Sequence, residues 1–221
     1  MRSYRICVVG GTGAEGSGLA LRWAKHGHQV TIGSRDTAKA RAKADELNRI
    51  LGETRIAGTS SQEGANAAEI VVLTVPFAAQ IETVRVLKQS LKGKVLVDVT
   101  VPLVPPNVAR VQLPASGSCV VAVQELLGAD TRVVSAFQNV SAHRLKQLGH
   151  RIECDVLVCS DSEEARQIGI ALAADAGLRG VNAGALANSV VAESLTSALI
   201  WMNRTYKIRD AGIRITGLPE S

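Results

Sequence analysis

The chain has few aromatic residues: two Phe, two Tyr and two Trp among 221 residues. So few rings argue against a surface built for stacking nucleic-acid bases. The formal net charge of +5 is small and typical of a solvated basic surface. We therefore expect no nucleic-acid partner, whereas small anionic ligands that carry phosphates or carboxylates would be favoured.

Motifs for metal binding and disulfide bonding are missing as well. Four cysteines and four histidines are present, but they form no C-x-x-C or H-x-x-x-H pair. Cys7 lies in an apolar run, and Cys154 and Cys159 flank another, where a free cysteine behaves as a small hydrophobe. We predict neither a metal site nor a disulfide framework.

No apolar run approaches the roughly 20 residues needed to cross a bilayer. The first apolar run becomes glycine-rich too soon for a signal peptide. We therefore expect a cytoplasmic protein with no membrane partner. The length of 221 residues and the hydrophobic content of 46% suit one well-buried α/β domain with a small appendage.

What the sequence does contain is a glycine-rich turn between a strand-like apolar run, residues 5–9, and a segment with helical spacing. Gly11, Gly13 and Gly16 follow the G-x-G-x-x-G pattern. In dinucleotide-binding folds the first glycine makes the turn, the second admits a pyrophosphate, and the third packs helix on strand. The alternative is a turn that binds no ligand. The strand before the glycines and the helix after them favour a dinucleotide cradle.

Strand-like and helical segments alternate along the rest of the chain, which predicts an α/β fold with a Rossmann-type doubly wound parallel sheet. The expected strands after the first are residues 29–33, 55–58, 69–76, 95–102, 132–137 and 154–159. We place an NADP-binding Rossmann domain at residues 1–180. A small C-terminal helical extension, residues 181–221, is expected to pack on the cofactor cleft.

The end of the second expected strand indicates which dinucleotide is bound. An NAD site would place an acidic residue there, about 20 residues past the glycines. This chain has Ser34 and Arg35 instead, whose hydroxyl and guanidinium suit a 2′-phosphate, and Lys39 lies one helical turn further on. The alternative makes Ser34 an N-cap and Arg35 a solvated charge. Together with the glycine turn, the pattern favours NADP(H).

No side chain is assigned as a catalytic acid, base or nucleophile. Neither G-x-S-x-G nor Tyr-x-x-x-Lys occurs. Asp98, the one acid within the fifth expected strand, is either an oriented catalytic group or a capping residue at the strand end. Hydride transfer between two ring cofactors has no need of such a group, because the protein has only to hold two ring faces together in a dry cleft.

Four stretches carry a resemblance to a known family. They are the glycine-rich residues 10–20, the pair Ser34-Arg35, residues 73–76 (Leu-Thr-Val-Pro) and residues 183–196. Together they resemble the NADPH-dependent coenzyme F420 reductases, also called F420:NADP oxidoreductases, and the resemblance spans essentially the whole chain. It implies hydride transfer between NADP(H) and the 5-deazaflavin coenzyme F420, by a protein that is usually a homodimer.

The resemblance also implies a site with two parts. The residues implied to bind NADP(H) are Gly11, Thr12, Gly13, Ala14, Gly16, Ser34, Arg35, Lys39, Val75 and Pro76. The residues implied to border the deazaflavin are Val101, Pro102, Gln138, Val140, Ala185 and Leu186. The loop at residues 138–141 reads Gln-Asn-Val-Ser where the family often has histidine and proline. An NADPH-dependent reductase of flavin or another small molecule, and a non-catalytic NADP-binding sensor, are therefore alternatives.

Overall fold

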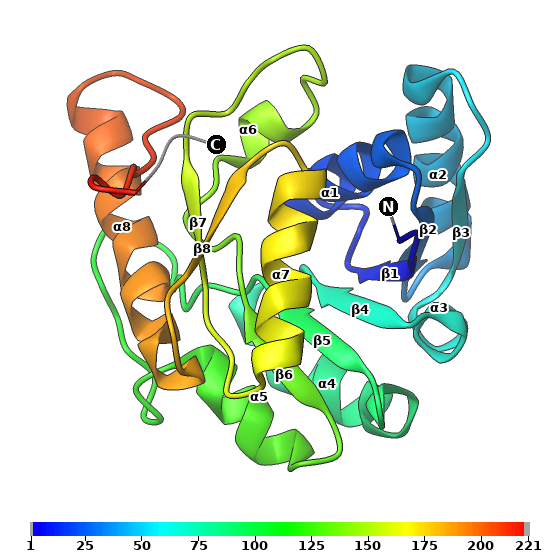
Figure 1. Cartoon of the computed structure of the whole chain (residues 1–221), viewed down its shortest axis with the longest axis horizontal. Coiled ribbons are helices and arrows are strands. Elements are labelled where there is room, and N and C mark those ends of the chain that lie inside the picture. The colour runs from blue at the N-terminus through cyan, green and yellow to red at the C-terminus, as the bar shows by residue number, and fades with distance from the viewer. Residues whose placement is uncertain (1, 219–221) are drawn as a thin grey trace.

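The computed structural model of the chain, which describes residues 2–218, contains a six-stranded parallel sheet flanked by helices (Figure 1). The strand order is β3-β2-β1-β4-β5-β6, so the doubly wound sheet predicted from the sequence is confirmed. The strands are β1 (Arg5–Val9), β2 (Gln29–Ser34), β3 (Ile56–Ser60), β4 (Ile70–Leu73), β5 (Val95–Asp98) and β6 (Arg132–Ser135). The order reverses between β1 and β4, which is where such sheets open a crevice at the carboxyl ends of their strands.

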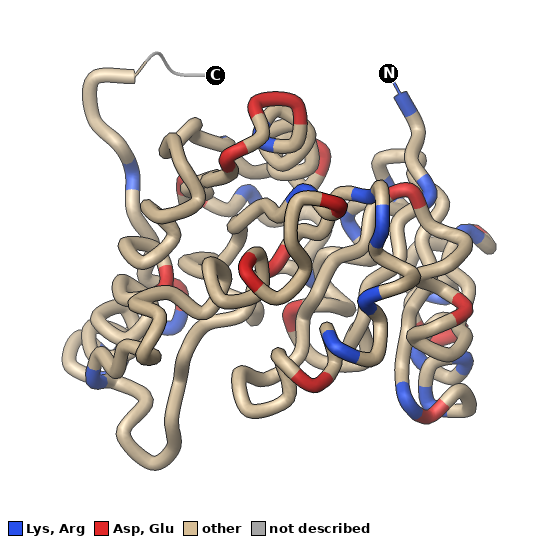
Figure 2. The backbone as a smooth tube through the Cα atoms, turned by 90° about the horizontal axis from the view of Figure 1, so that it is seen from below, with Lys and Arg blue, Asp and Glu red and all other residues tan. Residues whose placement is uncertain are grey.

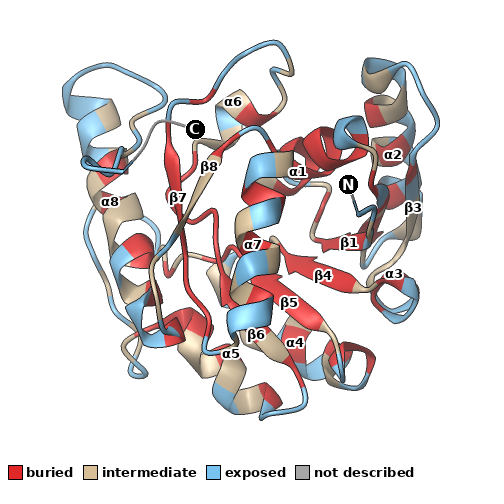
Figure 3. Ribbon diagram, viewed as in Figure 1, coloured by how far each residue is buried: buried red, intermediate tan, exposed pale blue. Residues whose placement is uncertain are grey.

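Helices cover both faces of this sheet, and alternate strand residues point to opposite faces. Ile6 and Val8 of β1 pack against helices α1 (Ala14–His26), α2 (Thr37–Leu51) and α7 (Glu163–Asp175). Cys7 and Val9 pack on the other side, against α3 (Ser61–Ala67), α4 (Phe77–Leu91) and α5 (Cys119–Leu127). Burial on both faces explains why these strands read as unbroken apolar runs (Figure 3).

A second, two-stranded parallel sheet pairs β7 (Asp155–Val158) with β8 (Arg179–Asn182). The strand expected at residues 154–159 is therefore present as β7, and within residues 2–218 its strand pairing with the main sheet is limited to an isolated bridge between Ser135 and Cys159. Strand β8 was not expected, because its sequence Arg-Gly-Val-Asn has little apolar character. The domain boundary predicted after residue 180 falls within β8.

Two side chains of α1 tie this second unit to the main sheet. The buried Arg22 guanidinium donates hydrogen bonds to the carbonyl oxygens of Leu145, which ends the short helix α6 (Ala142–Leu145), and of Ala176 after α7, at 2.7 and 2.9 Å. The Trp23 indole donates to the Leu172 carbonyl at 2.8 Å. Buried N–H donors need hydrogen-bond acceptors, and these carbonyl oxygens accept from them.

Helix α8 (Ser189–Thr205) is preceded by the 3₁₀ turn η1 (Leu186–Asn188). It is followed by an extended segment, residues 206–218, which we call the tail. The tail is part of the extension that was expected to pack on the cofactor cleft. It lies against the start of β7, where the Asp155 amide donates to the Ile213 carbonyl at 2.8 Å. The last three residues of the predicted extension lie outside the described residues.

The described helices include none that is long and apolar enough to cross a membrane. Lys and Arg are interspersed with Asp and Glu along the backbone (Figure 2).

Candidate functional site

A cleft of about 810 Å³ opens at the carboxyl ends of β1, β4 and β5. Many of the residues expected from the sequence to bind ligands line it together. These residues are Thr12, Gly13, Ala14, Ser34, Arg35, Val75, Pro76, Val101, Gln138 and Val140. Each ends a strand, follows the end of one or begins the next helix, so parallel strand direction brings residues from distant parts of the chain to one edge.

The glycine turn is built differently from the sequence expectation in one respect. Gly10, rather than Gly11, has the left-handed backbone conformation, with φ of 79°. A Cβ on Gly10 would also lie 2.9 Å from the Thr74 carbonyl oxygen. Gly11 packs closely against both β1 and β2. A Cβ there would be 2.8 Å from the Val8 carbonyl oxygen of β1 and 2.9 Å from Ile32 Cδ1 of β2.

The other two glycines have separate structural roles. A Cβ on Gly16 would lie 2.4 Å from Thr74 Oγ1, so glycine is what allows α1 to pack this closely on β4. A Cβ on Gly13 would meet nothing nearer than the Gly10 carbonyl oxygen at 3.5 Å, so this backbone is open to the cleft. Gly13 is also the N-cap of α1 and provides no capping side chain. The first-turn N–H groups of α1 therefore face the cleft without a side-chain partner.

Glu15, in the first turn of α1, is an ionisable residue of the cleft that sequence reasoning missed. Its Oε1 atom is buried and has no hydrogen-bond partner among the described residues. Burial raises the pKa of this carboxyl to about 8. The side chain is therefore largely neutral at pH 7. The one indication in the sequence that Glu15 lies in the cleft is that it comes two residues after Gly13.

The end of β2 presents Ser34 and Arg35 to the cleft. The N-cap of α2 is Asp36, whose carboxylate accepts from the Lys39 amide at 3.1 Å, so Ser34 is not the cap. Arg35 is exposed and has no ion pair or hydrogen bond within residues 2–218. Lys39 lies outside the cleft lining, and its exposed ammonium is 3.8 Å from the Asp36 carboxylate. Ser61, at the start of α3, also lines this end and was not expected.

The opposite end of the cleft has mainly apolar walls. Residues 75–77 (Val-Pro-Phe) follow β4, and Leu103, Pro105 and Val108 belong to the loop that crosses the carboxyl edge. Thr196 of α8 also reaches the cleft, and its hydroxyl donates to the Gln138 carbonyl oxygen at 2.7 Å. A predominantly apolar site with a few polar atoms suits flat ring systems.

Asp98 acts as a capping residue, in agreement with one of the two alternatives for it. Its fully buried carboxylate accepts from the Thr100 amide at 2.9 Å and from Gln80 Nε2 at 2.7 Å. Burial raises its pKa to about 6. Asp98 does not line the cleft, whereas Thr100 and Gln138 do. The Gln138 amide donates to the Asp98 carbonyl oxygen at 2.7 Å, which positions Gln138 at the cleft wall.

Several residues implied by the resemblance lie outside the cleft lining. Leu186 is 1% exposed and packs in the same apolar core as residues of α5, so its side chain does not reach the cleft lining. Pro102 is buried, and Ala185 is exposed away from the lining. Gly11 and Gly16 serve the packing of the turn, as described above. The burial of Leu186 and Pro102 depends on how distant segments pack, and the loop sequence does not reveal it.

A buried carboxylate on α8 anchors the end of the loop that covers the cleft. Glu193, 1% exposed, accepts from the Ser118 hydroxyl at 2.6 Å and from the Cys119 amide at 2.9 Å. These groups belong to the first turn of α5, whose N–H groups need an acceptor. Glu193 therefore fastens α8 to the point where the loop enters α5.

Residues 5–102 match the family described as NADP oxidoreductase, coenzyme F420-dependent. The F420-dependent NADP reductase of Methanothermobacter marburgensis is 40% identical over 223 residues, covering 98% of this chain and all of that protein. The enzyme of the same name from Methanocaldococcus jannaschii is 39% identical, covering 97% of this chain and 99% of its own length.

Solved structures show the same fold. A protein of Arthrobacter sp. FB24, assigned provisionally as an F420-dependent NADP reductase, has a TM-score of 0.80 at 24% identity and covers 97% of this chain and 100% of its own. An imine reductase variant from Myxococcus stipitatus, in complex with NAD+, has a TM-score of 0.60 at 19% identity over 94% of this chain and 62% of its own.

Proposed function

The chain belongs to the F420-dependent NADP reductases, and from this premise we propose how its cleft brings two redox cofactors together. The protein is an oxidoreductase that transfers a hydride between NADP(H) and coenzyme F420. The observation that carries the proposal is a single cleft with a phosphate-binding end and an apolar end.

The NADP(H) end is proposed to comprise the glycine turn, Ser34 and Arg35. The open backbone at Gly13 and the uncapped first turn of α1 fit a pyrophosphate, because N–H donors and the positive helix end favour anions. Arg35, free of partners within the described chain, fits the 2′-phosphate by two parallel charge-assisted hydrogen bonds. Lys39 is close in sequence and would add positive charge rather than a contact.

The ring end is proposed to lie between Val75-Pro76 and the segments that carry Val101, Gln138 and Val140. The two ring cofactors supply the redox chemistry, and the protein supplies orientation and a dry environment. Within the described chain, Glu15 and Arg35 are the only ionisable residues that line the cleft, and both belong to the phosphate end. The apolar walls exclude water from the ring faces, and Thr196 holds Gln138 in place.

The test is to mix the purified protein with NADPH and oxidised F420 and to follow the visible absorbance of the deazaflavin. Bleaching supports the proposal. The same assay with FMN in place of F420 is the control, because turnover with FMN alone would identify a flavin reductase. Binding of NADPH without turnover of any acceptor would identify a sensor. Either result would contradict the proposed function.

We also propose that the protein is a cytoplasmic homodimer. Large apolar side chains are exposed along α8 and the segment after it, including Trp201 at 63% and Tyr206 at 71% exposure. Clustered exposed apolar side chains are typical of a protein interface. Sedimentation of the wild type and of Trp201→Lys tests this, since the variant should shift the protein toward the monomer. A monomeric wild type would contradict it.

A further inference from the structure

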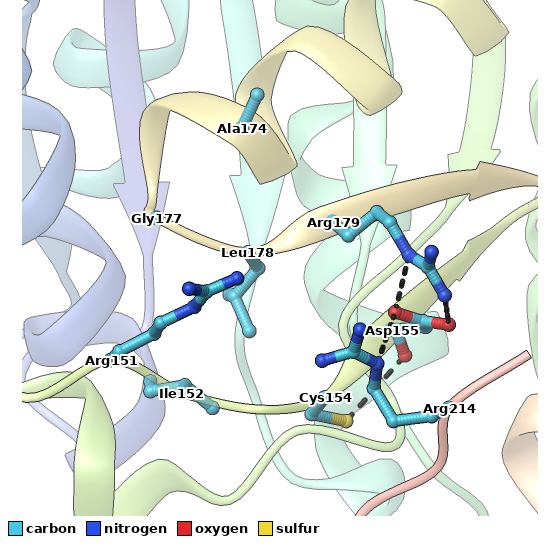
Figure 4. A pocket seen from close by; sticks show the side chains of 9 residues that line it. All are labelled: Arg151, Ile152, Cys154, Asp155, Ala174, Gly177, Leu178, Arg179 and Arg214. Atoms are coloured by element: carbon cyan, nitrogen blue, oxygen red, sulfur yellow. Dashed lines mark hydrogen bonds and ion pairs between the residues drawn. The ribbon is translucent and has the colours of Figure 1, made fainter. Parts of the chain in front are cut away.

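A second pocket, of about 420 Å³, lies where β7 begins (Figure 4). Within residues 2–218 it shares no lining residue with the cofactor cleft. Arginines from three separate segments meet there: Arg151 before β7, Arg179 at the start of β8, and Arg214 in the tail. One carboxylate, Asp155, faces them.

Both carboxylate oxygens of Asp155 already accept hydrogen bonds within the protein. Its carboxylate is 1% exposed and accepts from Arg179 Nε at 2.8 Å and from the Ile215 amide at 2.6 Å. The hydrogen bonds from Arg179 lower the pKa of Asp155, so it is ionised at neutral pH. Asp155 and Arg179 therefore neutralise each other, and Arg151 and Arg214 remain as surplus positive charge.

These two arginines face each other across the pocket. Figure 4 shows the Arg151 and Arg214 side chains extending from opposite sides into the space between them. Arg151 has no ion pair or hydrogen bond within the described part of the chain, and Arg214 Nε is 3.8 Å from the Asp155 carboxylate. Facing guanidinium groups repel unless an anion lies between them.

The position of Arg214 is preorganised by the backbone on both sides of it. The Ile213 carbonyl accepts from the Asp155 amide at 2.8 Å, and the Ile215 amide donates to the Asp155 carboxylate. The Arg214 side chain is still 41% exposed, so a solute can reach it. A binding site held in place before its ligand arrives loses little entropy when the ligand binds.

We propose that this pocket binds a phosphate-type oxyanion between Arg151 and Arg214. The planar guanidinium fork matches the oxygen geometry of phosphate, and a dianion accepts charge-assisted hydrogen bonds from both side chains. This site is separate from the proposed cofactor cleft. Because Arg214 belongs to the tail, the bound anion links the tail to the segment before β7 and stabilises both.

The proposal is tested by calorimetric titration of the full chain, saturated with NADP+ to fill the cleft, with inorganic phosphate. We expect one site per chain, and at least ~10-fold weaker binding in Arg151→Ala. Arg151 contacts no partner within residues 2–218, so this variant should fold normally. Arg214→Ala should weaken binding similarly. The exposed Arg85 on α4 supplies a matched control, Arg85→Ala, with unchanged binding.

No phosphate binding by the wild type, or binding that Arg151→Ala leaves unchanged, would overturn the proposal. The same titration is run without NADP+; phosphate binding that occurs only in the absence of NADP+ would place the phosphate in the cleft and would overturn the proposal as well. A parallel titration with glycerol phosphate separates the two sources of the ligand. Tighter binding of the ester indicates a phosphorylated metabolite, and tighter binding of inorganic phosphate indicates the free ion.

Discussion

At the scale of single residues, the cleft separates charge from apolar surface. Arg35 and Glu15 are its ionisable side chains within the described residues, and they differ in state. Arg35 is exposed and positively charged, whereas the pKa of Glu15 is raised by burial to about 8. A charged arginine and a largely neutral carboxyl are together compatible with several phosphate groups.

Replacement of Arg35 by alanine should weaken NADPH binding by ~10- to 100-fold, because charge-assisted hydrogen bonds to the 2′-phosphate are lost. NADH binding should change little, since NADH lacks that phosphate. Fluorescence titrations with both nucleotides measure this. Arg41→Ala, on the neighbouring helix α2 and outside the cleft lining, is the control. Equal losses for NADPH and NADH would refute the role assigned to Arg35.

Binding of NADP+ should weaken as the pH rises above about 8. Below its pKa, Glu15 is neutral and tolerates the pyrophosphate; above it, the carboxylate repels the phosphates and must take up a proton when the ligand binds. Because one proton is taken up on binding, the dissociation constant rises by no more than about tenfold for each pH unit. Glu15→Gln stays neutral and should show a flat profile between pH 7 and about 9. A wild-type profile that matches this variant would contradict the prediction.

At the scale of elements, α8 defines the cleft through two contacts one helical turn apart. Thr196 holds the Gln138 backbone, and Glu193 caps α5 at the end of the loop that carries Leu103 and Val108. Helix α1 also packs closely at the cleft, because Gly16 has no side chain and a Cβ there would clash with Thr74.

Glu193→Ala should destabilise the protein by about 2 kcal/mol, because it leaves buried donors at the start of α5 unpaired. The Michaelis constant for F420 should rise several-fold as the loop loses its anchor. The affinity for 2′,5′-ADP should change little, because that fragment binds at the other end of the cleft. Chemical denaturation, steady-state kinetics and titration measure the three quantities. Glu82→Ala, an exposed glutamate on α4, is the control. An unchanged Michaelis constant for F420 would rule out the anchoring role.

At the scale of the whole molecule, the two sheets are joined through α1 rather than through strand pairing alone. Arg22 donates to carbonyl oxygens of Leu145, Ala176, Arg144, Gln147 and His150. His26, the last residue of α1, and His28, two residues further on, both contact the Asp175 carboxylate at the end of α7, at 2.9 and 2.8 Å. These contacts predict that both sheets unfold together.

Arg22→Met should therefore lower the free energy of unfolding by about 3 kcal/mol, because several buried carbonyls lose their donor. Differential scanning calorimetry should show a single transition in the wild type, at a lower temperature in the variant. Arg49→Met, on the exposed face of α2, should leave the transition temperature nearly unchanged. Two separate transitions in the wild type would show that the two sheets unfold independently.

The parallel sheet, the dinucleotide turn and the family could all be predicted from the amino-acid sequence, because each depends on spacing within a short stretch of chain. The alternation of apolar strands and helices, the glycines at residues 10–16 and the pair Ser34-Arg35 are local patterns. They could be read without knowing which segments meet.

Four features could not be predicted in this way: the partners of Arg22, the partners of Glu193, the burial of Leu186 and the position of the tail. The physical reason is distance along the chain: Arg22 bonds to a carbonyl 154 residues away, and Glu193 caps a helix 74 residues before it. Such contacts depend on how the layers pack, and the charge surplus at Arg151 and Arg214 arises only after packing has satisfied Asp155.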